Sequence, residues 1–341
     1  MTDRPSSFLS ISIQPWGLLT AVGAVASAAT ILGFLGKYSW FLDLFSHFRV
    51  QYLLGLLVLG VLLLVARRRR TASVFLALAC LNAGVVLPLY FGKQPRPVGA
   101  MPSIRAMLLN VNTHRGDPER VRHVILGADP DILVLEEISS RWMSDLVWLT
   151  NSYPHSVAQP REDNFGIGLF SKLPLAESEV AYIGDADVPS ILATINTGRT
   201  NVRVVATHPL PPGGRDYSHW RNEQLERLPD YIRSTLPVLL LGDLNVTSWN
   251  YHFRKLLSRS GLRDSAQGYG VQPTWPNYNP ILRIPIDHCL HSPDIVIVDR
   301  RIGADVSSDH YPVIVDFVIG NNLAEDKWSE KTKGPGVVSR P

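Results

Sequence analysis

Cysteine is scarce in this sequence, which has only two cysteines among 341 residues. Cys80 lies in an apolar run and Cys289 lies far away in the polar part, so the sequence supports neither a disulfide framework nor a cysteine-rich metal site. A strong positive excess is also missing, because the formal net charge is +3 and Arg67–Arg70 alone supply four positive charges. This balance argues against tight, sequence-independent binding to long nucleic acid, although it is compatible with a local basic cleft.

Charged residues are rare in roughly the first 92 positions, where three apolar runs follow one another. Trp16–Leu35 has no charged residue and is long enough, as a helix, to cross the hydrocarbon core of a bilayer. Val50–Ala66 is rich in leucine and lies at the lower length limit for a span, and Thr71–Gly92 is the third run. We therefore predict a membrane anchor over residues 1–92, with three transmembrane helices at about 16–35, 50–66 and 71–92.

The alternative for the first run is a cleaved signal peptide, which its length and the two later runs disfavour. The arginines at 67–70 set the expected orientation, because positive residues stay on the cytoplasmic side. With three spans, the N-terminus is cytoplasmic and the chain after the third span is extracytoplasmic. We expect an integral protein of a bacterial inner or plasma membrane.

Two polar segments border the remaining part of the chain. Gln94–Pro102 carries three prolines in nine residues and predicts a semi-rigid linker at 93–103. Asn321–Pro341 is polar and predicts a disordered tail. Residues 104–320 are therefore the expected soluble catalytic domain.

Within residues 104–320, apolar runs predict strands, and apolar residues at helical spacing predict helices at Pro118–Gly127 and Arg221–Ile232. Because strands and helices do not alternate strictly, the pattern favours an α+β layered sandwich over a doubly wound sheet. The expected strands lie at 104–109, 131–135, 166–171, 191–195, 202–206, 238–241, 286–290 and 311–318.

Polar residues of catalytic type stand at or beside the ends of these runs. After Val238–Leu241 come Asp243 and Asn245, whose side chains share one face of an extended chain, about 7 Å apart. Alone, this motif is most simply a strand followed by an Asx-type turn. A whole series of such residues is hard to attribute to turns: Asn110, Glu137, His208, Asp243, Asn245, Asp287, Asp309 and His310.

These residue types suit metal-assisted phosphoester hydrolysis. Glu and Asn oxygens without a cysteine cluster favour Mg²⁺ or Mn²⁺ over structural Zn²⁺. Such a metal polarises a phosphoryl oxygen, while Asp243 orients or deprotonates the water and Asn245 donates a hydrogen bond to the transition state. If Asp287 and His310 lie together, the pair would hold the imidazole and favour its protonated form, and His208 is a second candidate for protonating the leaving oxygen.

The motifs LLNVN, DILVLEE, ATH, GDLN, IDH and SDHYPV, in this order, resemble those of the endonuclease/exonuclease/phosphatase superfamily. That superfamily includes AP endonucleases, pancreatic-type deoxyribonucleases, inositol polyphosphate 5-phosphatases and neutral sphingomyelinases. The resemblance covers residues 104–319. It implies a four-layer α/β/β/α sandwich, with two β-sheets packed face to face and helices outside.

The resemblance also implies a metal site. By position in the motifs, Glu137 is the principal Mg²⁺ carboxylate, Asn110 lies beside it, and Asp309 lies near the metal. Glu136 stands where many members have glutamine, so it is not assigned to the metal.

The implied catalytic residues come from the other motifs. Asp243 and Asn245 fall on the active-site Asp and Asn, and His310 falls on the catalytic histidine with Asp287 as its partner. His208 matches a histidine of the deoxyribonuclease and sphingomyelinase branches, where AP endonucleases differ.

Three further residues have a structural interpretation beside a functional one. Asn164 precedes a strand and suits either a turn or a phosphate contact. Arg221 is expected to serve helix packing or an ion pair, and Trp275 to pack in a loop rather than line a cleft.

We therefore predict a membrane-anchored, Mg²⁺-dependent phosphoric ester hydrolase, specifically a phosphodiesterase of nuclease or phospholipase/sphingomyelinase type. The alternatives are a phosphomonoesterase on the same fold and a non-catalytic membrane-bound binding module, whose mark would be the loss of one of the six motifs. The expected substrate is a phosphodiester of nucleic acid or phospholipid, the bilayer contacts the N-terminal helices, and no protein partner is predicted. We expect the isolated segment 104–320 to be active.

Overall fold

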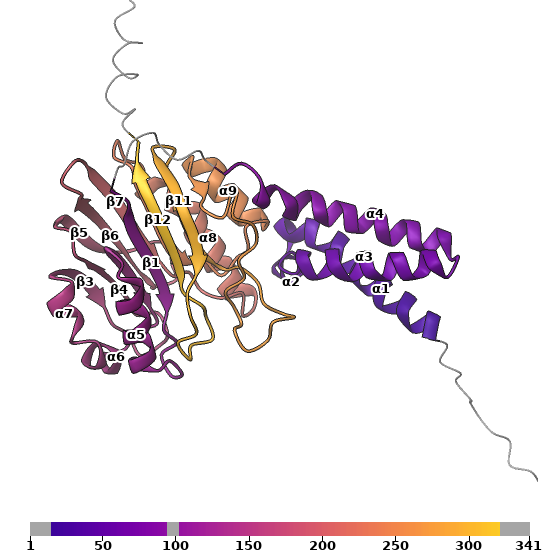
Figure 1. Cartoon of the computed structure of the whole chain (residues 1–341), viewed down its shortest axis with the longest axis horizontal. Helices are drawn as coiled ribbons and strands as arrows, with labels where there is room; N and C mark the ends of the chain where they lie inside the picture. Colours follow the sequence, from indigo (N-terminus) through magenta and orange to yellow (C-terminus); the bar gives the residue numbers. More distant parts are fainter. Residues whose placement is uncertain (1–14, 94–101, 321–341) are drawn as a thin grey trace, which may run out of the picture.

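A computed structural model describes residues 15–93 and 102–320, which form a two-sheet body and a group of helices that extends from one side of it (Figure 1). The tail predicted at 321–341 and most of the linker predicted at 93–103 lie outside the described residues. The extending helices come from the first apolar runs of the sequence and are, with their 3₁₀ turns, α1 (Pro15–Leu32), η1 (Gly33–Tyr38), α2 (Trp40–Leu44), α3 (Arg49–Val65), α4 (Arg69–Val86) and η2 (Leu87–Tyr90).

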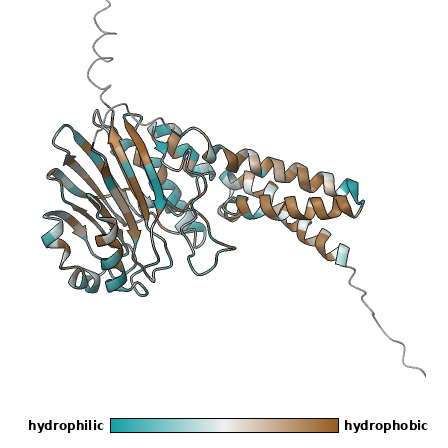
Figure 2. Ribbon diagram, in the orientation of Figure 1, coloured by the Kyte–Doolittle hydropathy of each residue, from teal (hydrophilic) through white to brown (hydrophobic). Residues whose placement is uncertain are grey.

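Within the described ranges, two helical segments are long and apolar enough to cross a membrane, rather than the three expected. They are Pro15–Tyr38 and Arg69–Tyr90. The prediction is wrong for the middle run, because α3 has only 17 residues. Its rise is about 25 Å, short of a hydrocarbon core of about 30 Å. Apolar residues cover much of all three helices in Figure 2.

Two kinds of contact hold these helices together. Leucines of α3, among them Leu59 and Leu63, pack against Phe75 of α4. Asn82 of α4 donates to the hydroxyl of Thr30 at 2.9 Å, and its side-chain oxygen accepts from the Arg49 guanidinium at 3.2 Å. Asn82 therefore joins helices, which is the role that a polar side chain between apolar helices commonly has.

The body contains two six-stranded sheets of mixed direction. The first has the order β11-β12-β1-β2-β4-β3 and the second the order β5-β6-β7-β8-β10-β9. Among the pairs in these sheets, only β1–β2 and β7–β8 are parallel, so the α+β class is confirmed. The strands are β1 (Ile104–Asn110), β2 (Ile132–Glu136), β3 (His155–Gln159), β4 (Ile167–Ser171), β5 (Leu175–Tyr182), β6 (Pro189–Asn196), β7 (Asn201–Thr207), β8 (Val238–Asp243), β9 (Arg263–Asp264), β10 (Asp287–His291), β11 (Ile295–Ile302) and β12 (Val313–Ile319).

One apolar cluster contains residues of both sheets. Leu108 of β1 and Val134 of β2 belong to it together with Ala206 of β7 and Leu241 of β8. Alternate residues of a strand point to opposite faces, so these side chains mark the faces that the sheets turn toward each other.

The opposite faces of the sheets are covered by helices. Leu109 of β1 packs with Val121 and Ile125, and Leu240 of β8 packs with Leu228. Burial on both faces explains why these strands read as continuous apolar runs. The helices are α5 (Pro118–Ala128), α6 (Ser140–Asp145) and α7 (Leu149–Ser152) beside the first sheet, and α8 (Arg215–Tyr231) and α9 (Tyr251–Ser260) beside the second.

Candidate active site

The polar residues singled out in the sequence lie where strands of both sheets end. Asn110, the last residue of β1, pairs in register with Glu136 of β2, and Asp243, the last residue of β8, pairs with Asp287, the first of β10. The backbone N–H of Asp243 donates to both carboxylate oxygens of Glu136, at 3.0 and 3.3 Å. The two sheets are therefore joined at this edge.

Gly242 allows another close approach at the same edge. A Cβ at this position would lie 1.9 Å from the carbonyl oxygen of Thr207, so no side chain fits there. The strands β7 and β8 come together at this point, and Nε2 of His208 lies 3.7 Å from Oδ2 of Asp243. The glycine of the GDLN motif thus brings the ATH motif beside the site.

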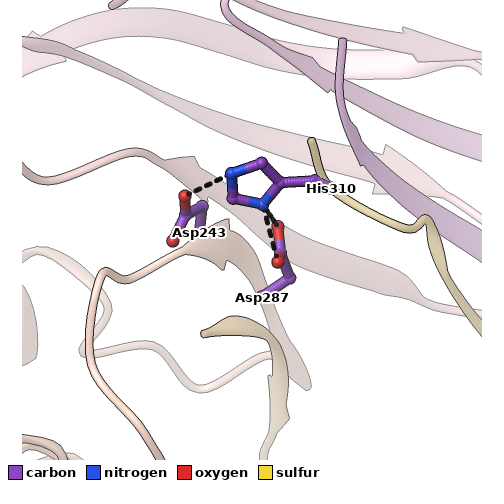
Figure 3. A group of neighbouring side chains, drawn as sticks. All are labelled: Asp243, Asp287 and His310. Atoms are coloured by element: carbon purple, nitrogen blue, oxygen red, sulfur yellow. Dashed lines mark hydrogen bonds and ion pairs between the residues drawn. The ribbon is translucent and has the colours of Figure 1, made fainter. Parts of the chain in front are cut away.

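His310 lies between two carboxylates, as Figure 3 shows. Its Nδ1 is 2.9 and 3.2 Å from the two oxygens of Asp287, and its Nε2 is 3.7 Å from Oδ2 of Asp243. All three side chains are buried. The imidazole therefore has a carboxylate partner at each nitrogen.

The charge state of the cluster follows from this arrangement. Burial opposes the charged form of His310, but Asp287 and Asp243 outweigh it and raise the pKa of His310 to about 10. Burial also tends to raise the pKa of Asp287, yet the neighbouring imidazolium holds it below its ordinary value. His310 is thus a cation at neutral pH, paired with the carboxylate of Asp287.

Asp243 and Asn245 form a tight turn after β8. The backbone N–H of Asn245 donates to Oδ1 of Asp243 at 2.9 Å, and the Asn245 side chain donates to the carbonyl of Pro209 at 2.9 Å. Asn245 has a φ of 53°, in the left-handed region that few residues other than glycine and asparagine adopt. Burial and the charge of Asp287 raise the pKa of Asp243 well above its ordinary range.

His208 differs from His310 in its charge. Burial, followed by the charge of His310, lowers the pKa of His208 to about 3. Its Nδ1 has no hydrogen-bond partner among the described residues. A neutral imidazole can donate only an uncharged hydrogen bond, so this environment disfavours His208 as a proton donor at neutral pH.

Glu137 follows β2 in an unusual conformation. Its φ is 61°, and such strain in a residue other than glycine is concentrated at functional sites. Asn110 donates to one carboxylate oxygen at 3.0 Å and the N–H of Thr113 donates to the other at 3.2 Å. Burial raises the pKa of Glu137, against the hydrogen bond from Asn110.

Asp309 is oriented by two donors from separate loops. The indole Nε1 of Trp275 donates to Oδ2 at 3.0 Å, and Asn112 donates to Oδ1 at 2.7 Å. Asp309 adds its negative charge to the surroundings of Glu137. The sequence-predicted metal residues Glu137, Asn110 and Asp309 therefore lie in one neighbourhood.

The donor set fits a hard divalent cation. Glu137, Asp243 and Asp309 line one cavity of about 230 Å³, and within residues 15–93 and 102–320 no lysine or arginine is among its lining residues. Three carboxylates beside the single positive charge of His310 suit Mg²⁺ or Mn²⁺, which take oxygen ligands. Ligand atoms of Asp243, Asp287 and His310 also lie within 4.8 Å of one another, but the positive charge of His310 disfavours a cation there.

The cavity wall includes residues that the sequence left open, placed outside the site or did not single out. Asn164 and Trp275 both line it, so the loop aromatic does face the cleft. His47, which precedes α3, also lines it. No local pattern indicates His47, because it comes from the first apolar region and reaches the site only through the tertiary fold.

Two further predictions from the sequence concern Glu136 and Arg221, whose side chains are both buried. Glu136 is fully buried, and burial followed by the charge of Asp243 raises its pKa well above its ordinary range. Its hydrogen bonds to Asp243 give it a structural part between the sheets, consistent with leaving it out of the metal site. Arg221 forms an ion pair with Asp43 at 2.6 Å, one of the two roles expected for it.

Comparisons with known proteins bear on the family of this chain. A sequence model of the Endonuclease/Exonuclease/phosphatase family matches residues 107–310, which contain all of the site residues predicted from the sequence. Among curated proteins, none matches the sequence.

Three solved structures are similar to this one. An endonuclease/exonuclease/phosphatase from Beutenbergia cavernae has 20% identity and a TM-score of 0.53, with 64% of this chain and 72% of that chain covered. D. rerio TDP2, complexed with a single strand DNA product, has 15% identity and a TM-score of 0.53, with 64% and 100% covered. The human Nocturnin catalytic domain, with a bound sulfate anion, has 20% identity and a TM-score of 0.51, with 65% and 96% covered. At these identities the likeness establishes the fold alone.

Proposed function

The chain belongs to the endonuclease/exonuclease/phosphatase family, and on this premise we propose that it is a divalent-metal-dependent phosphodiesterase carried by membrane helices. Hydrolysis of phosphoesters is the common activity of that family. The observation that supports the proposal best is the grouping of Asp243, the Asp287–His310 pair and Glu137 around one cavity at the joined edge of the sheets.

Each residue has a part that follows from its surroundings. Glu137, Asn110 and Asp309 are the proposed ligands of Mg²⁺ or Mn²⁺, which when bound polarises a phosphoryl oxygen and offsets the negative charge of the cavity. Asp243 orients the attacking water and accepts its proton, since its carboxylate lies at the cavity wall.

His310 and Asn245 stabilise the negative charge on the phosphoryl oxygens in the transition state. The imidazolium of His310 is held in place by Asp287, and its Nε2 is directed toward Asp243 and the cavity. The Asn245 amide supplies a further hydrogen-bond donor, a kind of contact worth about 3 kcal/mol in oxyanion sites. His208, neutral and buried, contributes a hydrogen bond and leaves proton donation to His310.

The wider arrangement of the chain is part of the proposal. We assign residues 104–320 to a four-layer α/β/β/α catalytic domain and α1 and α4 to a membrane anchor, which the apolar length of these helices supports. A phospholipid is favoured over long nucleic acid, because the cavity lacks lysine and arginine among its described lining residues and has apolar walls that include Phe165 and Ile284.

The test uses the full chain in detergent micelles. Bis(p-nitrophenyl) phosphate, p-nitrophenyl phosphate, DNA, RNA and phospholipid vesicles are assayed side by side with Mg²⁺, Mn²⁺ or EDTA. We expect metal-dependent cleavage of the diester and of phospholipid, with little release from the monoester. Faster release from the monoester would identify a phosphomonoesterase, and no cleavage of any substrate with either metal would refute the proposal.

A further inference from the structure

The segment between the first two apolar helices packs into the catalytic body. Asp43 of α2 lies against α8, where its Oδ2 accepts a hydrogen bond from Arg221 at 2.6 Å. The side chains of Asp43 and Arg221 are 1% and 0% exposed. Removal of one member of so buried a pair leaves the other charge uncompensated, which destabilises proteins strongly.

Arg221 extends this contact to the site. Its Nη1 donates to the backbone carbonyl of Asn245 at 3.2 Å. Asn245 is the residue whose left-handed backbone follows Asp243 in the GDLN turn. The chain of contacts from Asp43 through Arg221 therefore ends on a residue that we place in the transition-state site.

The second oxygen of Asp43 is used as well. Asn250 donates to Oδ1 of Asp43 at 2.6 Å and to the hydroxyl of Ser46 at 3.1 Å. The side-chain oxygen of Asn250 accepts from the N–H of His252 at 2.8 Å and caps α9. Asp43 thus also ties the start of α9, which follows the GDLN turn, to the helical segment.

Two more residues of the segment contact the cavity or a loop beside it. His47 lines it, is buried, and has its Nδ1 3.4 Å from the hydroxyl of Thr247. Gln51, in the first turn of α3, donates to the carbonyl oxygens of Ile281 and Arg283 at 3.0 and 3.1 Å. Those carbonyls belong to the loop between two cavity-lining residues, Trp275 and Ile284.

We propose that residues 40–51 are an integral part of the active site, in which Asp43 and Arg221 are positioning residues for Asn245 and His47 forms part of the substrate-binding wall. The helical region then has a function beyond attachment, because the site is complete only when this segment is docked. This inference rests on the proposed function. It replaces the expectation that segment 104–320 is active alone, since that segment lacks the carboxylate that pairs with Arg221.

The test compares variants of the full chain in detergent micelles, with Mg²⁺ and bis(p-nitrophenyl) phosphate. Arg221→Lys keeps the charge but loses the planar fork that bridges Asp43 and Asn245. Asp43→Asn/Arg221→Met removes both charges and so avoids a lone buried ion. For each variant we expect a kcat about tenfold to a hundredfold lower, because small misplacements at a reacting centre have effects of this size, with KM changed by less than about twofold.

The thermal unfolding midpoint separates positioning from stability. We expect the double variant to unfold near the wild-type temperature while its kcat stays low. A matched control is Glu226→Gln, which removes exposed ion pairs with Lys255 and Arg259 on the same two helices and should leave kcat unchanged. A folded double variant with the wild-type kcat would overturn the positioning roles.

His47 has its own readout. His47→Ala enlarges the cavity, so we expect the ratio of kcat/KM between a large and a small diester to change by about threefold or more. An unchanged ratio overturns the place of His47 in the wall.

If the wild type hydrolyses none of the substrates, the proposed function is refuted but the inference is still open to test. Calorimetry with inorganic phosphate and Mg²⁺ then decides the inference. We expect the double variant to bind phosphate about tenfold more weakly than the wild type. Equal affinities of the two proteins, or no binding of phosphate to the wild type, would overturn the inference.

Discussion

Nδ1 of His310 lies 2.9 Å from the carboxylate of Asp287, and both side chains are buried at the edge where the two sheets meet. Because this carboxylate is a main cause of the raised pKa of His310, the variant Asp287→Asn should leave the imidazole largely neutral and free to turn. We expect kcat to fall by about 10²- to 10⁴-fold, the range of general acid–base contributions. Steady-state hydrolysis of a diester by the full chain measures this, and a loss below threefold would contradict the role of the pair.

Asp243 is the proposed acceptor of the proton from water. The variant Asp243→Asn keeps the shape of the side chain and the hydrogen bond from the Asn245 N–H but removes the basic carboxylate. We expect the rate of diester cleavage to fall to the background of the assay, with the unfolding midpoint retained or raised because a buried charge is removed. His310→Ala should also abolish activity. Residual rates above one tenth of wild type in both variants would refute the mechanism.

Glu137 is the proposed principal metal carboxylate. Glu137→Gln keeps the size of the side chain and its ability to form hydrogen bonds, but it removes the charge that binds the cation. The Mg²⁺ concentration that gives the half-maximal rate should therefore rise by about tenfold or more. High Mg²⁺ should restore part of the rate. Glu162→Gln, at a carboxylate outside the cavity lining, is the control and should leave the Mg²⁺ dependence unchanged. If Glu137→Gln and wild type needed the same Mg²⁺ concentration for the half-maximal rate, Glu137 would not be a metal ligand.

A pH-dependent contribution to stability lies away from the site, at Arg105 and Asp316. The guanidinium donates to both carboxylate oxygens, at 2.6 and 3.0 Å. Burial tends to raise the pKa of Asp316, but Arg105 holds it below its ordinary value. The pair therefore stabilises the fold above about pH 4 and loses its effect as the pH falls through the lowered pKa of Asp316.

We accordingly expect Asp316→Asn to lower the free energy of unfolding by about 1 kcal/mol at pH 7, as for well-formed pairs near the surface. The difference from wild type should shrink as the pH approaches 2. Thermal unfolding at both pH values measures it, and an equal difference at the two would show that the substitution acts by some means other than charge.

The body of the fold could be predicted where burial leaves a local pattern. Val238–Leu241 is apolar throughout because β8 is covered on one face by the other sheet and on the other by helices. The expected helices at 118–127 and 221–232 overlap α5 and α8 for the same reason. By contrast, β5 at Leu175–Tyr182 has five exposed residues among eight and lacks the apolar run on which the prediction depends.

Features that depend on distant pairing could not be predicted in this way. An ion pair is one of the roles expected for Arg221, but nothing local identifies Asp43 as its partner, and only the fold brings the two together across 178 positions. His47 illustrates the same limit at the site, since its role depends on where α2 is docked.

The indole of Trp275 shares Asp309 with the proposed metal site, to which it donates a hydrogen bond, and its ring centroid is 6.4 Å from that of His310. A cation that draws on the same carboxylate weakens the indole hydrogen bond, and indole emission responds to such changes in polarity. The fluorescence of Trp275 should therefore report metal binding. The difference in fluorescence between wild type and Trp275→Phe, followed through a titration, reads metal occupancy without any substrate being turned over.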